Sequence, residues 1–288
     1  MMKQPLFTGV CTALVTPFLG GKVNYPMLEI LLRRQIEYRI PAVVICGTTG
    51  EAPTLSDDEK LSLFQKSKEI CGRETLVIAG TGSNDTHHAV MLSIAAEKAG
   101  ADGLLVVSPY YNKANADGII AHYKAISDSV SIPIIVYNVP SRTGLDIPVE
   151  VYRELGKLSN IAGIKEASNS IQKTGKIIAA CDLPVWSGND DMTVPAVALG
   201  AKGVISVLSN VSPLKASLMT QAALAGDFDT AACLHKNLLP LMDALFCDVN
   251  PIPVKAAMGL IGFDCGDCRL PLGKLSEEKL SILRSVIA

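Results

Sequence analysis

Short apolar runs recur about every 20 to 35 residues along the first two thirds of the chain, and longer segments with helical periodicity separate them. Most of these runs are apolar throughout, without the polar alternation of a half-exposed strand. Such runs are typical of parallel strands that helices cover on both faces. Eight of them are found, at residues 9–18, 42–47, 75–80, 103–109, 133–138, 161–167, 184–190 and 203–208.

The segments between the runs carry helix boundary signals. Ser56 precedes an amphipathic stretch and is followed three residues later by Glu59, which is the pattern of a capping box. Gly100 and Gly200 each follow a helical segment and come directly before a predicted strand, where glycine commonly ends a helix. The pattern therefore predicts alternating strands and helices.

Eight strand–helix units within about 210 residues favour an α/β fold of the (β/α)8 TIM-barrel type. The alternative is an open, doubly wound sheet, but no G-x-G-x-x-G motif follows the first strand. After about residue 225 the strand-like runs cease and helical patterns continue to the end. We therefore expect a barrel over residues 1–225 and a C-terminal helical extension over residues 226–288.

Composition and charge restrict the classes of partner. The 288 residues are 49% hydrophobic and 19% charged, with a net charge of −2 and no cluster of basic residues. This argues against a nucleic-acid partner, which requires a basic face. No apolar run approaches the ~20 residues of a membrane span, and the first residues lack the apolar core of a signal peptide. We expect no membrane partner and a cytoplasmic location.

The cysteines and histidines indicate no metal centre. Eight cysteines are spread over the chain without a secretion signal, so free thiols are expected. Cys265 and Cys268 form a lone C-x-x-C, for which a structural role is favoured over a metal or redox role. The four histidines form no metal-binding pattern.

Polar residues gather where the apolar runs end, and a barrel places its chemistry at the C-terminal ends of its strands. The segments concerned are GTTGE (47–51), SPYYN (108–112), YNVPSRTG (137–144), KE (165–166) and SGND (187–190). If the barrel forms, these segments converge on one mouth.

Lys165 is the most informative of these residues because it lies inside the apolar run IAGIKEA (161–167). Burial disfavours the ammonium form of a lysine, and the neutral amine is the form that attacks a carbonyl group. The alternative is a lysine at the rim that reaches water or pairs with a carboxylate. Tyr137 ends the neighbouring strand, where its phenol could move protons beside Lys165. The alternative for Tyr137 is core packing.

Three further residues are candidates for holding carboxylates. Thr48 and Thr49 lie in a glycine-flanked turn that can present N–H groups and hydroxyls to an anion. Arg142 follows a proline-containing turn and could bind a carboxylate with two hydrogen bonds. Ordinary turn chemistry and a surface ion pair are the alternatives for these positions. Together the candidates predict a Schiff-base site for a small 2-oxo acid.

The motifs GTTGE, SPYYN, YNVPSRTG, GIKEA (163–167) and GVISV (203–207), in this order, resemble the dihydrodipicolinate synthase family. The similarity extends from LFTGVCTALVTPF near the N-terminus through NPIPVK (250–255) to RLPL (269–272). The resemblance implies a barrel enzyme that condenses pyruvate with L-aspartate 4-semialdehyde to 4-hydroxy-tetrahydrodipicolinate. This is the first committed step towards diaminopimelate and lysine.

The resemblance also implies roles for the catalytic residues. Lys165 would form the Schiff base with pyruvate, and Tyr137 would relay protons through Thr48. Tyr111 would reach across a tight dimer interface and complete the relay in the neighbouring subunit.

The remaining implied roles concern binding and assembly. Thr48 and Thr49 would hold the carboxylate of pyruvate, Arg142 that of the aldehyde, and Gly188 and Ile205 would line the site. No metal or organic cofactor is implied beyond the covalent adduct. A homotetramer of tight dimers is expected.

Two other readings remain open. N-acetylneuraminate lyase and the 2-keto-3-deoxy sugar acid aldolases share the lysine and tyrosine, although Thr49, the pair Tyr110 and Tyr111 and the segment around Arg142 side with the synthase. A non-catalytic sensor of 2-oxo acids would be expected to have lost Lys165 or Tyr137, and both are present.

One departure from the family concerns feedback inhibition by lysine. Inhibited members hold the inhibitor with a glutamate that corresponds here to His88, and two of their histidines correspond to Asp57 and Lys60. Asn84 and Tyr110 remain as the remnant of such a lysine site. We therefore expect weak or absent inhibition by lysine.

Overall fold

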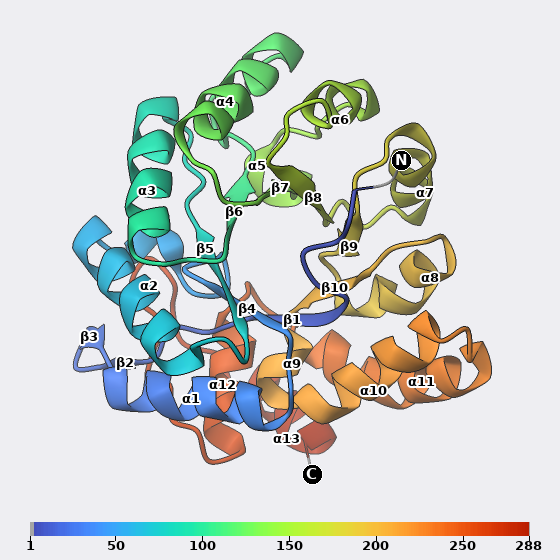
Figure 1. Ribbon diagram of the computed structural model, residues 1–288. Coiled ribbons are helices and arrows are strands. Elements are labelled where there is room, and N and C mark those ends of the chain that lie inside the picture. The colour runs from blue at the N-terminus through green and yellow to red at the C-terminus, as the bar shows by residue number, and fades with distance from the viewer. Residues whose placement is uncertain (1–2, 288) are drawn as a thin grey trace.

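The strands of the computed structural model, which describes residues 3–287, form a closed parallel barrel (Figure 1). Their order around the barrel is β1-β10-β9-β8-β7-β6-β5-β4. The predicted TIM barrel is thereby confirmed. The strands are β1 (Gly9–Ala13), β4 (Ala42–Ile45), β5 (Leu76–Gly80), β6 (Gly103–Val107), β7 (Ile134–Asn138), β8 (Ile161–Glu166), β9 (Val185–Ser187) and β10 (Gly203–Ser206).

Helices surround the barrel (Figure 1), and four short helical elements follow the C-terminal ends of individual strands within the described residues. The surrounding helices are α1 (Tyr25–Glu37), α2 (Asp57–Cys71), α3 (Thr86–Lys98), α4 (Ala116–Ser129), α6 (Val149–Leu155), α7 (Ile171–Ala180), α8 (Thr193–Ala198) and α10 (Pro213–Leu224). The short elements are α5 (Pro140–Thr143), α9 (Leu208–Val211), η1 (Ala52–Thr54) and η2 (Asp190–Met192). The sequence did not predict the hairpin of β2 (Phe18–Leu19) and β3 (Lys22–Val23).

The predicted helix boundaries are present. The Ser56 side chain accepts a hydrogen bond from the Glu59 backbone at 3.2 Å, and the Glu59 carboxylate accepts one from the Ser56 backbone at 3.0 Å. Gly100 and Gly200 adopt φ angles of 88° and 111°, a backbone conformation that would be strained for a residue with a side chain. The confirmed capping box and both glycine stops fix where α2, α3 and α8 begin or end.

Apolar residues fill the barrel lumen as well as the layer between strands and helices. Trp186 and Phe7 stack in the lumen, with ring centroids 4.7 Å apart. A Cβ atom on Gly163 would lie 2.4 Å from the Trp186 ring. Gly163 therefore makes room for Trp186, the largest side chain of the lumen. On β8 it precedes Lys165 by two residues.

Three helices follow the barrel, α11 (Phe228–Ala244), α12 (Ile252–Leu260) and α13 (Glu277–Ile287). They lie with α10 along one side of the barrel, in the orange and red part of Figure 1. Helices after the barrel were predicted, and the division at residues 225 and 226 stays a prediction. Within the described residues no helix is both long and apolar enough to cross a membrane.

Candidate active site

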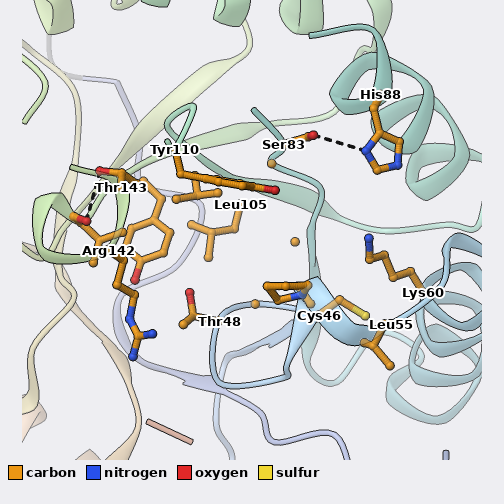
Figure 2. Close-up of a pocket in the computed structure, with 18 of the residues that line it drawn as sticks. Cys46, Thr48, Leu55, Lys60, Ser83, His88, Leu105, Tyr110, Arg142 and Thr143 are labelled. Carbon is orange, nitrogen blue, oxygen red and sulfur yellow. Dashed lines mark hydrogen bonds between the residues drawn. The ribbon is translucent and has the colours of Figure 1, made fainter. Parts of the chain in front are cut away.

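A cavity of about 580 Å³ lies at the mouth of the barrel, among residues that follow β4, β5, β6 and β7 (Figure 2). Thr48, Tyr137 and Arg142 line it, and so do Tyr110 and His88. Segments that are far apart in the sequence thus meet at the mouth of the barrel, where the polar residues at the strand ends were predicted to converge. Thr48 and Arg142 lie on one side of the cavity in Figure 2, and His88 lies on the other.

Lys165 and Tyr137 are register partners on the neighbouring strands β8 and β7. Both are buried, each with 6% of its surface exposed, and the Lys165 Nζ lies 4.3 Å from the centroid of the Tyr137 ring. Among the described residues, none forms a hydrogen bond or an ion pair with this Nζ. The amine is therefore held by packing against an aromatic ring and has no carboxylate partner.

The residues that follow this pair along each strand bind one another. Asn138 and Glu166 are also register partners. The Asn138 Nδ2 donates to the two carboxylate oxygens of Glu166 at 3.1 and 3.0 Å, and to Asp146 at 2.9 Å. The Ser168 backbone N–H donates to Glu166 at 2.8 Å. Burial raises the pKa of the Glu166 carboxyl, and these hydrogen bonds oppose the rise. The network ties β7 to β8 directly behind Tyr137 and Lys165.

Gly188 and Ile205 complete the surroundings of the lysine. A Cβ atom on Gly188 would lie 3.1 Å from the Lys165 Cε and 2.5 Å from the Ala167 Cβ, so any larger residue would crowd the lysine side chain. Ile205 is fully buried in the lumen cluster that also contains Tyr137. The structure therefore places Gly188 against Lys165 and Ile205 in the same lumen.

The segment that carries Thr48 and Thr49 is a tight turn. The Gly50 backbone N–H donates to the Gly47 carbonyl at 3.1 Å, and the Glu51 N–H donates to the Thr48 carbonyl at 3.1 Å. Thr48 lines the cavity, whereas Thr49 is 3% exposed and is not part of the cavity wall. Within one chain, Thr48 is thus accessible from the cavity and Thr49 is not part of its wall.

Arg142 lies in α5, where the sequence predicted a turn, and its side chain reaches into the cavity wall. One guanidinium nitrogen, Nη2, donates to the Asn250 carbonyl at 3.1 Å. No carboxylate among the described residues pairs with Arg142, so its charge remains available to a ligand.

The two neighbouring tyrosines are placed differently. Tyr110 lines the cavity, whereas Tyr111 is 87% exposed and has a φ angle of 74°, in the left-handed region. Within one chain Tyr111 does not reach the cavity. Asn84 is likewise outside the cavity wall, and its backbone carbonyl accepts a hydrogen bond from the side chain of Asn112 at 2.9 Å.

His88 forms a small polar cluster at the far end of the cavity. Its Nε2 lies 2.9 Å from an Asp57 carboxylate oxygen, and its Nδ1 lies 3.3 Å from the Ser83 hydroxyl. Lys60 approaches the other Asp57 oxygen at 3.4 Å. Partial burial pushes the pKa of the Asp57 carboxyl up, but His88 and Lys60 together hold it below its usual value. The only carboxylate of the cluster is therefore already paired.

A buried ion pair that no sequence pattern predicted supports the turn. Glu51 and Lys255 form it, with 2.9 Å between Oε1 and Nζ and side chains 0% and 2% exposed. The other Glu51 oxygen accepts a hydrogen bond from the Arg269 backbone at 2.8 Å. The available signal was that NPIPVK and RLPL, which contain Lys255 and Arg269, were among the motifs of the resemblance. Spacing alone does not reveal that they meet Glu51.

Cys46 is the one cysteine that lines the cavity, and the other seven, all of them in the described part of the chain, lie outside its wall. All eight cysteines lie in the described part of the chain and are free. Burial raises the pKa of both the Cys265 and the Cys268 thiols to about 12, which makes them poor nucleophiles. Residues 3–287 contain no group of three or more histidine, cysteine or acidic side chains suited to a metal ion.

The fold and the buried lysine, which is in register with a tyrosine at the mouth, define the class of protein. It is an α/β-barrel protein with a lysine amine at its candidate active site. Comparison with protein families specifies this class further. The model of the dihydrodipicolinate synthetase family matches residues 6–288. The chain belongs to this family.

Individual relatives are similar over their whole length. The 4-hydroxy-tetrahydrodipicolinate synthase of Acetivibrio thermocellus is 46% identical, over 99% of this chain and 98% of the relative. That of Caldicellulosiruptor saccharolyticus is 48% identical, over 99% and 97%. The crystal structure of a chloride-inhibited dihydrodipicolinate synthase from Acinetobacter baumannii, complexed with pyruvate, has a TM-score of 0.96 at 39% identity and covers 98% of both chains.

Proposed function

We propose that Lys165 is the covalent nucleophile of this enzyme. The activity is that of a 4-hydroxy-tetrahydrodipicolinate synthase of lysine biosynthesis, as the family match and the full-length relatives indicate. This enzyme condenses pyruvate with L-aspartate 4-semialdehyde. The observation that carries the proposal is the buried Lys165 amine, which packs on Tyr137 and has no carboxylate partner among the residues that the structure describes.

In the proposed reaction, the Lys165 Nζ attacks the keto carbon of pyruvate, and loss of water gives an iminium ion. Removal of a methyl proton then gives an enamine. The enamine carbon attacks the aldehyde carbon of the second substrate, and a proton is delivered to the new alkoxide. The amino group of that substrate attacks the former keto carbon and displaces Lys165, which closes the ring and restores the free amine.

Each step moves a proton, and we assign this work to Tyr137. Its ring contacts the lysine amine, and its hydroxyl has no partner among the described residues. Thr48 lines the same cavity and is proposed as the middle of the relay. Tyr111 points out of its own chain, which supports its proposed role in the cavity of a second subunit across a tight dimer interface.

The substrate carboxylates are assigned to the mouth of the cavity. Thr48 and Thr49 are proposed to hold the pyruvate carboxylate, and Arg142 that of the aldehyde. The free charge of Arg142 supports its assignment. Gly188 and Ile205 are proposed to shape the space around the adduct.

The remaining proposals concern assembly and regulation. We propose a homotetramer built from tight dimers, a cytoplasmic location, and a reaction without a metal or organic cofactor. Inhibition by lysine is proposed to be weak or absent, because the carboxylate beside His88 is already paired with His88 and Lys60. Half-inhibition by sub-millimolar lysine would overturn this part.

The experiment that tests the function follows turnover of pyruvate with L-aspartate 4-semialdehyde in a coupled assay. N-acetylneuraminate and 2-keto-3-deoxy sugar acids are compared as substrates for cleavage. The expected result is turnover of the aldehyde with pyruvate and little cleavage of the sugar acids. Faster cleavage of a sugar acid would assign the chain to a sister activity.

A further inference from the structure

We propose that Asn250 is a positioning residue that orients Thr49 and Arg142, the groups assigned to the two substrate carboxylates. The inference rests on the proposed function, because it concerns how these two groups bind their ligands. Asn250 lies between α11 and α12, outside the barrel strands. It is 5% exposed.

One asparagine contacts both binding groups. Its side-chain Nδ2 donates to the Thr49 Oγ1 at 3.0 Å, and its backbone carbonyl accepts from the Arg142 Nη2 at 3.1 Å. Thr49 follows β4 and Arg142 lies in α5, so neither contact is local in sequence. The segment after α11 therefore links the two sides of the mouth.

The direction of the bond to Thr49 has a chemical consequence. A threonine hydroxyl has one hydrogen to donate and two lone pairs that can accept. The Asn250 amide occupies a lone pair, and no described residue accepts the hydroxyl hydrogen. The hydrogen therefore has no acceptor among the described residues, although Thr49 itself is not part of the cavity wall, which its neighbour Thr48 lines. A carboxylate accepts hydrogen bonds and donates none, so it requires this polarity of Thr49.

The bond to Arg142 leaves its charge intact. A neutral carbonyl anchors one N–H of the guanidinium, and the other N–H groups keep the planar geometry that binds a carboxylate with two hydrogen bonds. An acidic residue in place of the carbonyl would neutralise the arginine. Asn250 therefore fixes Arg142 without competing with the substrate.

The surrounding structure holds Asn250 itself in place. Lys255, five residues later, forms the buried ion pair with Glu51, two residues after Thr49. The Lys255 Nζ also donates to the Asp267 carbonyl at 3.1 Å. The segment that carries Asn250 and the turn that carries Thr49 are thus held together by the same ion pair. The buried Asn250 Oδ1 has no hydrogen-bond partner within residues 3–287, so the Nδ2 bond to Thr49 is the hydrogen bond that holds this amide there.

The test compares Asn250→Ala and Asn250→Asp with the matched surface variants Asn237→Ala and Asn237→Asp, which lie on the exposed side of α11. For Asn250→Ala we expect the KM for pyruvate to rise about tenfold, as loss of one hydrogen bond to the binding group implies, with kcat within about threefold. The Asn237 variants should leave both constants unchanged.

Asn250→Asp reverses the polarity, because a carboxylate accepts the Thr49 hydrogen and places a negative charge near the pyruvate carboxylate. We expect the KM for pyruvate to rise about a hundredfold near neutral pH. The KM should fall again as the pH decreases and the new carboxyl becomes protonated and able to donate. A purely structural role would not produce recovery at low pH.

An unchanged KM for pyruvate in Asn250→Asp would overturn the inference. It would mean that in the wild type the Thr49 hydroxyl already donates its hydrogen to the side chain of Asn250 and not to the substrate. If the aspartate variant does not fold, Asn250→Ala combined with Thr49→Val decides the matter. The inference requires the double variant to bind pyruvate no more weakly than Thr49→Val alone, and additive losses contradict it. In every variant, borohydride with saturating pyruvate should still label Lys165. Absence of that label in the wild type would instead overturn the proposed function.

Discussion

Two buried lysines stand in contrasting surroundings, one at the mouth of the barrel and one between the barrel and its C-terminal helices. Lys165 is 6% exposed and Lys255 is 4% exposed. The Nζ atom of each lysine lies over an aromatic ring, that of Tyr137 at 4.3 Å for Lys165 and that of Phe18 at 4.4 Å for Lys255. Burial and aromatic contact therefore do not distinguish them.

The difference lies in the partner. Lys255 forms an ion pair with Glu51, whereas Lys165 has no carboxylate within ion-pair distance among the described residues. An ion-paired ammonium has no free lone pair to attack a carbonyl, and it compensates the charge of its partner. The unpaired amine of Lys165 is therefore suited to chemistry, whereas the paired amine of Lys255 stabilises the fold.

The largest effect is expected from Lys165→Met. We expect turnover to fall by a factor of about a thousand or more, because the covalent step loses its nucleophile. The free energy of unfolding should not decrease, since no partner is left uncompensated. A steady-state assay and urea denaturation measure the two quantities. Substantial residual turnover, or a marked loss of stability, would make Lys165 structural.

Lys255→Met should affect stability instead. Removing one partner of a buried ion pair is expected to cost about 3 to 5 kcal/mol, because Glu51 becomes an uncompensated buried charge. The double variant Lys255→Met with Glu51→Gln should recover part of this loss. Urea denaturation measures both. An unchanged midpoint in the single variant would contradict the structural assignment.

Tyr137→Phe separates the aromatic contact from the chemistry. The ring beneath Lys165 remains and only the hydroxyl is lost, so we expect turnover to fall about a hundredfold through loss of proton transfer. Tyr152→Phe, which removes a buried hydroxyl outside the cavity wall, is the matched control. If the two variants had equal turnover, Tyr137 would serve packing alone.

His122 extends the comparison to a buried histidine that, in the described part of the chain, contacts the Thr86 hydroxyl and hydrogen-bonds to no charged group. Burial lowers the pKa of His122 to about 4 from the usual 6.5. The unfolded chain therefore binds more protons between these values, and the stability from this group is present above pH 6.5 and decreases as the pH falls. Between pH 7 and pH 5 we expect a loss of about 2 kcal/mol.

The measurement is the free energy of unfolding of the wild type and of His122→Gln at both pH values. The variant should lose less stability on acidification than the wild type, and the exposed His87→Gln should behave as the wild type. Parallel curves for His122→Gln and the wild type would rule out this contribution.

The barrel could be predicted because its signals are local. Apolar runs, the capping box at Ser56 and the glycine stops each arise within a few residues. Several of the apolar runs extend beyond the strands that the structure contains, so the predicted strands were too long. Residues 9–18, for example, contribute to the barrel only over Gly9–Ala13, and Phe18 already belongs to the β2–β3 hairpin outside it.

The candidate site could be predicted only in part. Lys165 and Tyr137 were found because a polar residue in an apolar run is visible from the sequence. The contact of Asn250 with Thr49 joins residues 201 positions apart, and that of Lys255 with Glu51 spans 204. No periodicity or spacing encodes such pairs. Tyr111 is exposed within its own chain, so its assignment depends on a second subunit.

The most direct test of the contrast between the two lysines is reduction by borohydride in the presence of pyruvate, followed by peptide mass spectrometry. We predict one stable adduct on Lys165 and none on Lys255. Failure to detect an adduct on Lys165, or an adduct on Lys255 in the folded protein, would contradict it.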